Sequence, residues 1–407
     1  MNVTIRLVLK SHKNISLIYI LTFLQNSLIW APIWILFYLR FTDYAGIGIL
    51  ESMMIMVIVF GEIPTGALAD LLGRRRTLVL AFLFSALGNL CMGLASDFPL
   101  LIVGVVVATL GSALSSGTVE ALVYDTLLEE GKEKQYQAIS GNMSSLKMLA
   151  IALSSVIGGW VYQLSPGLPF IVVAVIHLLG ALLSLALIEP SINSEVFSFK
   201  NYIKQTKTGL KTLFNRQHPL LLKQNILLIL MNMIIVMNWH SLMDIQLVDQ
   251  GWDGQALGLI TAAMYLLASV LSQSSKWLSH KHHSWTISLG SSVLVAVSMI
   301  LIPRLGMILG TGIIMLRNGL TEIFSNAANQ HINSVTESKY RATTLSTYNM
   351  LSNIFYVVAA YFMGQLMDAY SVNGVVATLG LALLVITLLA PVVVGRKAKE
   401  SGKGYNN

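Results

Sequence analysis

Residues 61–76 read GEIPTGALADLLGRRR, an apolar segment that ends in a glycine and three consecutive arginines. Gly66 lets a neighbouring helix approach closely, and Gly73 allows a tight turn. Asp70 can accept hydrogen bonds from that turn or from the positive end of a neighbouring helix. The three arginines are expected to anchor the turn in the headgroup region of a bilayer. The segment therefore predicts a turn between two closely packed helices at a membrane surface.

The chain around this segment is strongly apolar and carries few charges. Of its 407 residues, 55% are hydrophobic and 11% are charged, whereas about 25% are charged in ordinary soluble domains. Its repeated apolar runs match the length of about 20 residues that a helix needs to cross a bilayer. A soluble enzyme, a nucleic-acid-binding domain and a disordered chain are excluded as whole-protein interpretations, because a water-soluble fold cannot hide so many such segments.

We predict an all-α polytopic membrane protein with about twelve transmembrane helices. The expected spans lie near residues 15–39, 45–68, 77–96, 100–127, 143–163, 169–188, 221–247, 255–278, 285–303, 305–329, 344–368 and 373–394. The first apolar run is too long for the core of a cleaved signal peptide, so we expect it to remain as a span.

The long basic connector after the sixth span suggests two halves. We expect a bundle over 1–189, a cytoplasmic amphipathic linker over 190–220, and a second bundle over 221–407 with a short cytoplasmic tail. An offset of 206 residues places Asn26 on Asn232 and Asp43 on Asp249 within the same span layout. The two bundles are therefore predicted to be pseudo-symmetric.

Orientation follows from the distribution of lysine and arginine. In the predicted layout, 22 of the 26 Lys and Arg residues lie in tails and loops on one side. Cytoplasmic loops of membrane proteins carry this excess of positive charge, so both termini are expected in the cytoplasm, in a multi-pass protein of the plasma membrane. The net charge of +7 is thus explained by topology, and we expect no nucleic-acid partner.

Residues 61–76 resemble the Gly-x-Leu-Ala-Asp-basic-x-Gly-basic-basic loop of the major facilitator superfamily, and the span layout is similar to that family along nearly the whole chain. The resemblance implies two six-helix bundles and a loop that latches the cytoplasmic side of the outward-open state. Asp70 would then face the start of the eleventh span near Thr344, although Leu71 stands where the family prefers a basic residue. The implied gating residues are Gly66, Asp70, Gly73, Arg74, Arg75 and Arg76.

Ionisable side chains inside the predicted spans are functional candidates, because each costs about 2.5 to 3.5 kcal/mol at the bilayer centre. Glu120 and Lys147 lie at similar depth in antiparallel spans and are predicted to pair, either as a static ion pair or as a protonation-sensitive one. Arg317 and Glu322 are five residues apart, so they do not share a helix face and are expected to find partners on other spans. Together with Asp125 these residues are the candidates for proton coupling, with Glu322 the leading one.

Polar and aromatic residues in spans 1, 7 and 10 are the candidates for a substrate cavity. The family resemblance implies that spans 1, 4, 7 and 10 line such a cavity. Pro32 is expected to weaken the first span between Trp30 and Trp34. The candidate cavity residues are Gln25, Asn26, Trp30, Asn232, Asn238, Trp239 and Asn318.

The fifth span bears on the direction of transport. Drug–proton antiporters of the superfamily carry a Gly-x8-Gly-x3-Gly-Pro-x2-Gly-Gly pattern there. Anchored on Gly158 and Gly159, this chain has Gly141, Ala150, Ser154 and Ser155 at the earlier positions, so it keeps small residues but lacks the proline. The resemblance to the twelve-span drug–proton antiporter group is therefore partial.

Three functions remain open from the sequence. The first is proton-driven efflux of small amphipathic compounds by alternating access, and the chain's 18 methionines suit such a promiscuous surface. The second is a proton-coupled carrier of a defined metabolite, organic anion or metallophore, with Arg317 binding the anion. The third is a membrane receptor or lipid-handling protein without transport.

Several partners and activities are not expected. The sequence contains no nucleotide-binding Gly-x4-Gly-Lys-Ser/Thr loop, so an ATP-driven pump is disfavoured. We expect no enzymatic activity, no metal and no cofactor, with a proton gradient as the energy source. The expected partners are the lipid bilayer, protons and a small-molecule substrate, in a monomer.

Overall fold

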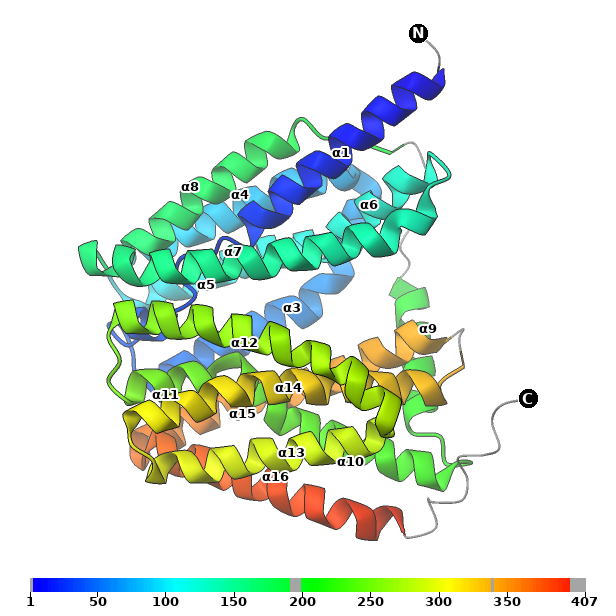
Figure 1. Cartoon of the computed structure of the whole chain (residues 1–407). Coiled ribbons are helices and arrows are strands. Elements are labelled where there is room, and N and C mark those ends of the chain that lie inside the picture. Colours follow the sequence, from blue (N-terminus) through cyan, green and yellow to red (C-terminus); the bar gives the residue numbers. More distant parts are fainter. Residues whose placement is uncertain (1–2, 191–198, 338–339, 396–407) are drawn as a thin grey trace. The chain divides into compact units, whose positions relative to one another are not determined.

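The computed structural model describes residues 3–190, 199–337 and 340–395, apart from the side chains of 3–12, 62–71, 199–202, 205, 275–276, 280 and 342. The described chain is helical and contains no strand. This confirms the predicted all-α fold. The α-helices, drawn in Figure 1, are α1 (Val3–Gln25), α2 (Trp34–Tyr38), α3 (Tyr44–Leu72), α4 (Arg74–Gly93), α5 (Phe98–Ser115), α6 (Thr118–Leu128), α7 (Tyr136–Leu164), α8 (Leu168–Ser184), α9 (Phe199–Leu213), α10 (Pro219–Met237), α11 (Met243–Asp249), α12 (Gly254–Lys281), α13 (Ser284–Leu301), α14 (Met307–Val335), α15 (Arg341–Ala369) and α16 (Val372–Val394).

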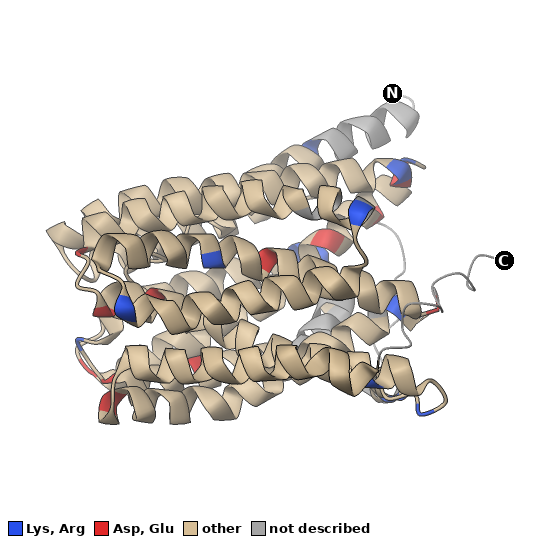
Figure 2. Ribbon diagram, turned by 60° about the horizontal axis from the view of Figure 1, so that its bottom comes forward, with Lys and Arg blue, Asp and Glu red and all other residues tan. Residues whose placement is uncertain are grey.

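Within the described residues, 10 helical segments are long and apolar enough to cross a membrane by length and composition. They correspond to the predicted spans 2 to 5 and 7 to 12. The sixth predicted span is α8, a shorter apolar helix over Leu168–Ser184. Figure 2 shows that charged residues are sparse along these helices, as a bilayer requires.

The first predicted span, over 15–39, is interrupted in the region where Pro32 was expected to weaken it. Helix α1 ends at Gln25, and the helical pattern resumes only at Trp34 in the short α2. Pro32 has no N–H to donate. Upstream of it, side chains occupy the backbone acceptors, because Asn26 Nδ2 donates to the Thr22 carbonyl at 2.8 Å and Ser27 Oγ donates to the Phe23 carbonyl at 2.8 Å.

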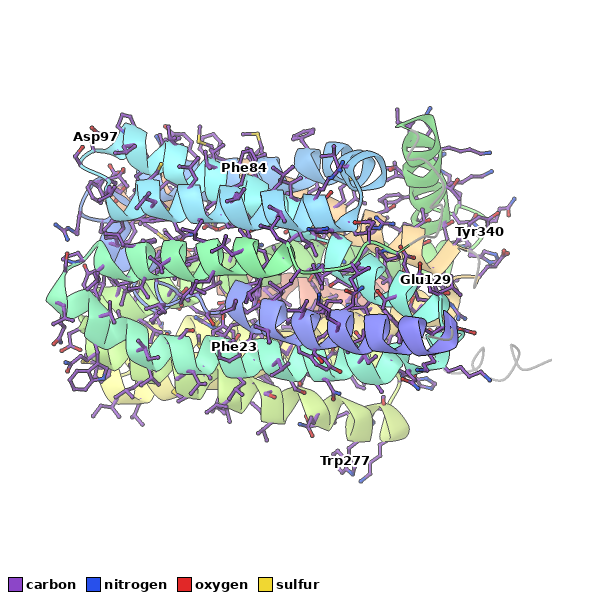
Figure 3. All side chains as sticks on the ribbon, turned by 90° about the horizontal axis from the view of Figure 1, so that it is seen from above. Phe23, Phe84, Asp97, Glu129, Trp277 and Tyr340 are labelled. Carbon is purple, nitrogen blue, oxygen red and sulfur yellow. The ribbon has the colours of Figure 1, made fainter. Side chains whose placement is uncertain are left out.

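The fourth predicted span is interrupted as well. Helix α5 ends at Ser115 and α6 begins at Thr118, because Gly117 adopts a left-handed conformation with φ 72°. Figure 3 shows Asp97, which caps the start of α5, and Glu129, which follows α6, at opposite ends of this broken span. The interruption therefore lies inside the spanning segment.

The chain divides into two compact units. Unit 1 comprises Met1–Asn201 and Trp252–Tyr265, and unit 2 comprises Tyr202–Gly251 and Leu266–Asn407. In unit 1, α4 packs between α5 and α8, α3 packs on α5, and α1 packs on α7 and α8. A cluster of buried apolar side chains, which includes Ile18, Phe82 and Leu122, joins α1, α4 and α6.

Unit 2 contains most of α9, then α10 and α11, the part of α12 from Leu266 onward, and α13 to α16. Helix α13 packs on α14 and α16, and α10 packs on α15 and α16. The seventh predicted span is α10, a π-helical turn over Asn238–Leu242, and α11. The amphipathic α9 lies against α15, where a Cβ on Gly209 would come within 2.1 Å of Thr347 Oγ1.

Candidate functional site

The turn of residues 61–76 is held in unit 1 by two acids, Asp125 of α6 and Glu189 of the non-helical segment after α8. Gly73 has φ 89°, as the predicted tight turn requires, and α4 begins directly after it. The carboxylate of Glu189 accepts hydrogen bonds from the backbone N–H groups of Arg74 at 2.5 Å and Arg75 at 2.8 Å. A carboxylate at the positive end of a helix is favourable, so Glu189 stabilises the start of α4.

Arg74 also reaches the fourth span. Its Nε lies 3.5 Å from Asp125 Oδ2. Asp125, a candidate for proton coupling, is therefore an ion-pair partner of the turn, and Glu189 is a partner that the sequence did not suggest. The side chain of Asp70 and the surroundings of Gly66 lie outside the described residues, so the predicted approach of Asp70 to the eleventh span and the close helix packing at Gly66 stay predictions.

A pocket of about 240 Å³ lies within unit 2, between α10, the π-helical turn, α14 and α15. It brings together three predicted residues, Asn232, Trp239 and Glu322. The other lining residues are Ile235, Val236, Thr321, Ser325, Asn329, Tyr348 and Asn349. Amides and hydroxyls thus face an aromatic ring and aliphatic side chains across one pocket.

The π-helical turn determines how Trp239 meets this pocket. Such single turns insert a residue into a helix and are frequent at functional sites. Trp239 is 50% exposed. Its neighbour His240 stacks on Tyr356 with ring centroids 4.9 Å apart, and Ser241 Oγ lies 2.9 Å from Tyr356 Oη. The turn is therefore fixed to α15 by His240 and Ser241, which leaves the Trp239 indole at the pocket.

The pocket is acidic. Glu322 is the one carboxylate among its described lining residues, and none of them is a lysine, arginine or histidine. On the opposite wall, Asn232 Nδ2 donates to Ser352 Oγ at 2.8 Å, which orients its amide between α10 and α15. The arrangement can hold a polar or cationic solute against an aromatic face.

Arg317 does not line this pocket. Its side chain is 0% exposed, and its Nη2 donates to Gln246 Oε1 at 2.5 Å. Gln246 Nε2 donates in turn to Asn373 Oδ1 at 3.3 Å, and Asn373 Nδ2 to Asp249 Oδ2 at 3.3 Å. Arg317 therefore has a partner on the seventh span, as predicted, but the partner is a neutral amide. Its Nε and Nη1 have no hydrogen-bond partner among the described residues.

Other predicted cavity residues lie elsewhere. Asn238 and Asn318 are buried in unit 2 away from the pocket lining. In unit 1, Gln25 at the end of α1 donates to Ser115 at the end of α5, which joins the two interrupted spans. Trp30 stacks on Phe170 of α8 with ring centroids 5.8 Å apart and planes at 4°. Asn26 bonds to its own helix end, as described above.

The predicted ion pair of Glu120 and Lys147 is not formed. Both side chains are exposed, and neither makes an ion pair within the described part of the chain. Glu120 stands in the first turn of α6, directly after the left-handed Gly117. The interruption turns α6 relative to α5, so depth along an unbroken fourth span did not predict which face Glu120 occupies.

Seven lining residues were missed from the sequence, and five of them carry polar groups. Ser325 and Asn329 follow Glu322 at helical spacing on α14, so the periodicity of that helix could have indicated them. Thr321 precedes Glu322 directly. Tyr348 and Asn349 carry no comparable signal, because their helix, α15, was not expected to line the cavity.

The apolar helices, the buried polar contacts between them and the pocket inside unit 2 define a multi-pass α-helical membrane protein. Residues 15–331 match the sequence profile described as Major Facilitator Superfamily. This match covers more than half of the chain, which therefore belongs to the Major Facilitator Superfamily.

Curated relatives match over part of their length. The chain is 27% identical to the uncharacterized MFS-type transporter YxaM of Bacillus subtilis (strain 168) over 201 residues, which is 48% of this chain and 49% of the relative. It is 30% identical to the D-xylose-proton symporter-like 3, chloroplastic, of Arabidopsis thaliana over 135 residues, 30% of this chain and 23% of the relative. The matched parts thus span about half of the first relative (49%) and about a quarter of the second (23%).

Solved structures share the fold over nearly the whole chain. The nucleoside transporter NupG superposes with a TM-score of 0.75 at 13% identity, covering 95% of this chain and 99% of its own. A POT family transporter in complex with 5-aminolevulinic acid superposes with a TM-score of 0.68 at 15% identity, covering 94% and 96%. At these identities the likeness shows the fold alone.

Proposed function

We propose that this protein is a secondary active transporter of the MFS type that exports small amphipathic compounds in exchange for protons. The observation that carries the proposal is the acidic, aromatic pocket of unit 2. Family membership and the transporter names of the relatives support the general activity. The substrate, the direction and the proton coupling are inferences from the pocket and from the resemblance to drug–proton antiporters.

The composition of the pocket favours neutral or cationic compounds over anions. Glu322 supplies negative charge, and the half-exposed Trp239 supplies an aromatic face that attracts cations. Arg317, the residue that an anion carrier would use, lies outside the lining and donates to Gln246. An organic anion is therefore the less favoured substrate.

Glu322 is proposed as the site where protons and substrate compete. A protonated carboxyl loses its attraction for a cation, so proton binding releases the substrate. The two ligands then favour different states of the carrier, as coupling requires, because a ligand shifts a conformational equilibrium only by its differential affinity for the states. Rocking of the two bundles would convert this competition into exchange across the membrane.

A second candidate is a proton-coupled carrier of a defined polar metabolite. The amides of Asn232, Asn329 and Asn349 favour it, since several directional hydrogen bonds select one solute more strongly than an apolar surface does. Neighbours in the fold include transporters of nucleosides and peptides by name. The range of substrates distinguishes the two candidates.

The test is substrate-dependent proton movement in proteoliposomes under an imposed pH gradient, with a panel of cationic, neutral and anionic compounds. We expect several unrelated lipophilic cations to elicit proton flux in the wild type, and Glu322→Gln to abolish it. Glu133→Gln is the matched control, because Glu133 is exposed in a short 3₁₀ turn outside the pocket. Flux with one polar compound alone would support the metabolite carrier, and undiminished flux in Glu322→Gln would contradict the role of Glu322.

A further inference from the structure

A second hollow in unit 2 lies apart from the pocket described above. It is an apolar groove of about 290 Å³ where the end of α12, the first turns of α13 and the middle of α14 meet. Its floor is a small hydrophobic cluster in which Leu278 and Leu320 pack on the buried Ile287 and Ile323. The groove therefore offers a continuous aliphatic surface.

The groove is open and elongated along the helix axis. Gly290 lines it and has no heavy atom within 4 Å of the position that a Cβ would occupy. From Thr286 to Leu294 the lining follows α13 for about 12 Å, at 1.5 Å per residue. His282 lies at one end, beside the turn that joins α12 to α13. The groove thus runs from a polar helix end into the apolar part of the unit.

The polar end of the groove is basic. His282 lines the groove there, and its exposed sequence neighbours Lys281 and His283 stand beside it. The sequence from 254 to 301 contains no Asp or Glu. Lys281 Nζ lies 3.9 Å from the ring centroid of Trp277, which is 59% exposed. An exposed tryptophan beside a lysine is typical of the membrane–water interface.

We propose that this groove binds one acyl chain of an anionic phospholipid whose headgroup is held by Lys281, His282 and His283. The apolar floor suits the chain, and the basic residues beside the groove suit a phosphate, as for other basic clusters at the membrane surface. A zwitterionic lipid would gain the same acyl contacts but less from the charges. The site does not depend on the transported substrate.

The test compares phosphatidylglycerol with phosphatidylcholine of the same acyl chains, bound to the full-length purified protein and counted by native mass spectrometry. We expect the wild type to retain phosphatidylglycerol preferentially. Gly290→Leu fills the groove and is expected to reduce that retention about tenfold. Lys281→Gln removes one charge and is expected to reduce it about fivefold, while retention of phosphatidylcholine changes little.

Matched controls separate the groove from the general lipid-facing surface. Gly312→Leu adds the same side chain at an exposed glycine of α14 that also has nothing within 4 Å, and Lys134→Gln removes an exposed lysine from unit 1. Both are expected to bind lipid as the wild type does. Thr286→Phe is a second way to fill the groove if Gly290→Leu does not fold.

Two results would overturn the proposal. Equal retention of the two lipids by the wild type would mean that the groove is only a part of the apolar face in contact with bulk lipid. Wild-type retention of phosphatidylglycerol in both Gly290→Leu and Lys281→Gln would place the lipid elsewhere.

Discussion

Single charged side chains inside this protein meet very different partners. Asp125 lies beside Arg74 of the turn after α3, whereas Arg317 is buried against the amide of Gln246. Glu322 faces a pocket. Each residue could be singled out from the sequence because charge is costly at bilayer depth. Which partner each one meets depends on side chains from other helices.

Arg317 provides a test at the residue scale. Replacing a buried charge by an apolar side chain of similar volume is often neutral or stabilising, whereas a large-to-small change leaves a cavity that costs about 2–5 kcal/mol. We therefore expect Arg317→Met to change the free energy of unfolding by no more than about 1 kcal/mol, so that its thermal unfolding midpoint stays close to that of the wild type. Arg317→Ala is expected to lower the midpoint. Both midpoints can be measured in the same detergent.

Transport by the same variants adds a second measurement. If Arg317 is structural, Arg317→Met retains proton flux with cationic compounds. Loss of transport in Arg317→Met with an unchanged unfolding midpoint would instead favour the anion carrier.

At the scale of elements, interruptions determine where side chains lie. The first span contains no α-helix over residues 26–33, and α7 packs directly on that segment. A Cβ added to Gly158 of α7 would come within 1.9 Å of the Ile29 carbonyl oxygen. The glycine pair of the fifth span therefore serves close packing, as its small residues suggested. Asn26 and Pro32 interrupt the first span, and α7 packs on the residues of this interruption.

Two alanine substitutions in α7 test this packing. Gly158→Ala forces the backbone contact apart and is expected to destabilise the protein by about 1–3 kcal/mol. Gly141→Ala, in the same helix with nothing within 4 Å, is expected to stabilise it by about 0.5–1 kcal/mol. Thermal unfolding of both variants measures the difference, and equal effects would mean that α7 does not approach the segment so closely.

At the scale of the whole molecule, the chain forms two compact units, each with its own buried polar contacts. Helix α12 begins in one unit and ends in the other, which the prediction of a boundary at 190–220 did not include. The orientation, with both termini in the cytoplasm of a plasma-membrane protein, stays a prediction from the distribution of Lys and Arg.

Cysteine labelling tests that orientation. Cys91 is the one cysteine of the chain, so Cys91→Ser gives a background without thiols. In that background, Ser96→Cys is expected to react with a membrane-impermeant maleimide added outside intact cells. Lys134→Cys, beyond the other end of the broken span α5–α6, is expected to react only after permeabilisation. The reverse pattern would place the termini outside.

The helical membrane fold, the family and the place of nearly every span could be predicted from the sequence. Apolar length and Lys/Arg asymmetry are local properties that a bilayer imposes on each segment separately. The sequence also indicated Asn232, Trp239 and Glu322 as candidate site residues. Tertiary packing brings these three residues to one pocket with α15 and leaves Glu120 and Lys147 without the predicted ion pair within the described residues. Helix rotation after Gly117 and in the π-helical turn, together with packing between distant spans, sets those contacts, and neither is encoded in the spacing along one helix.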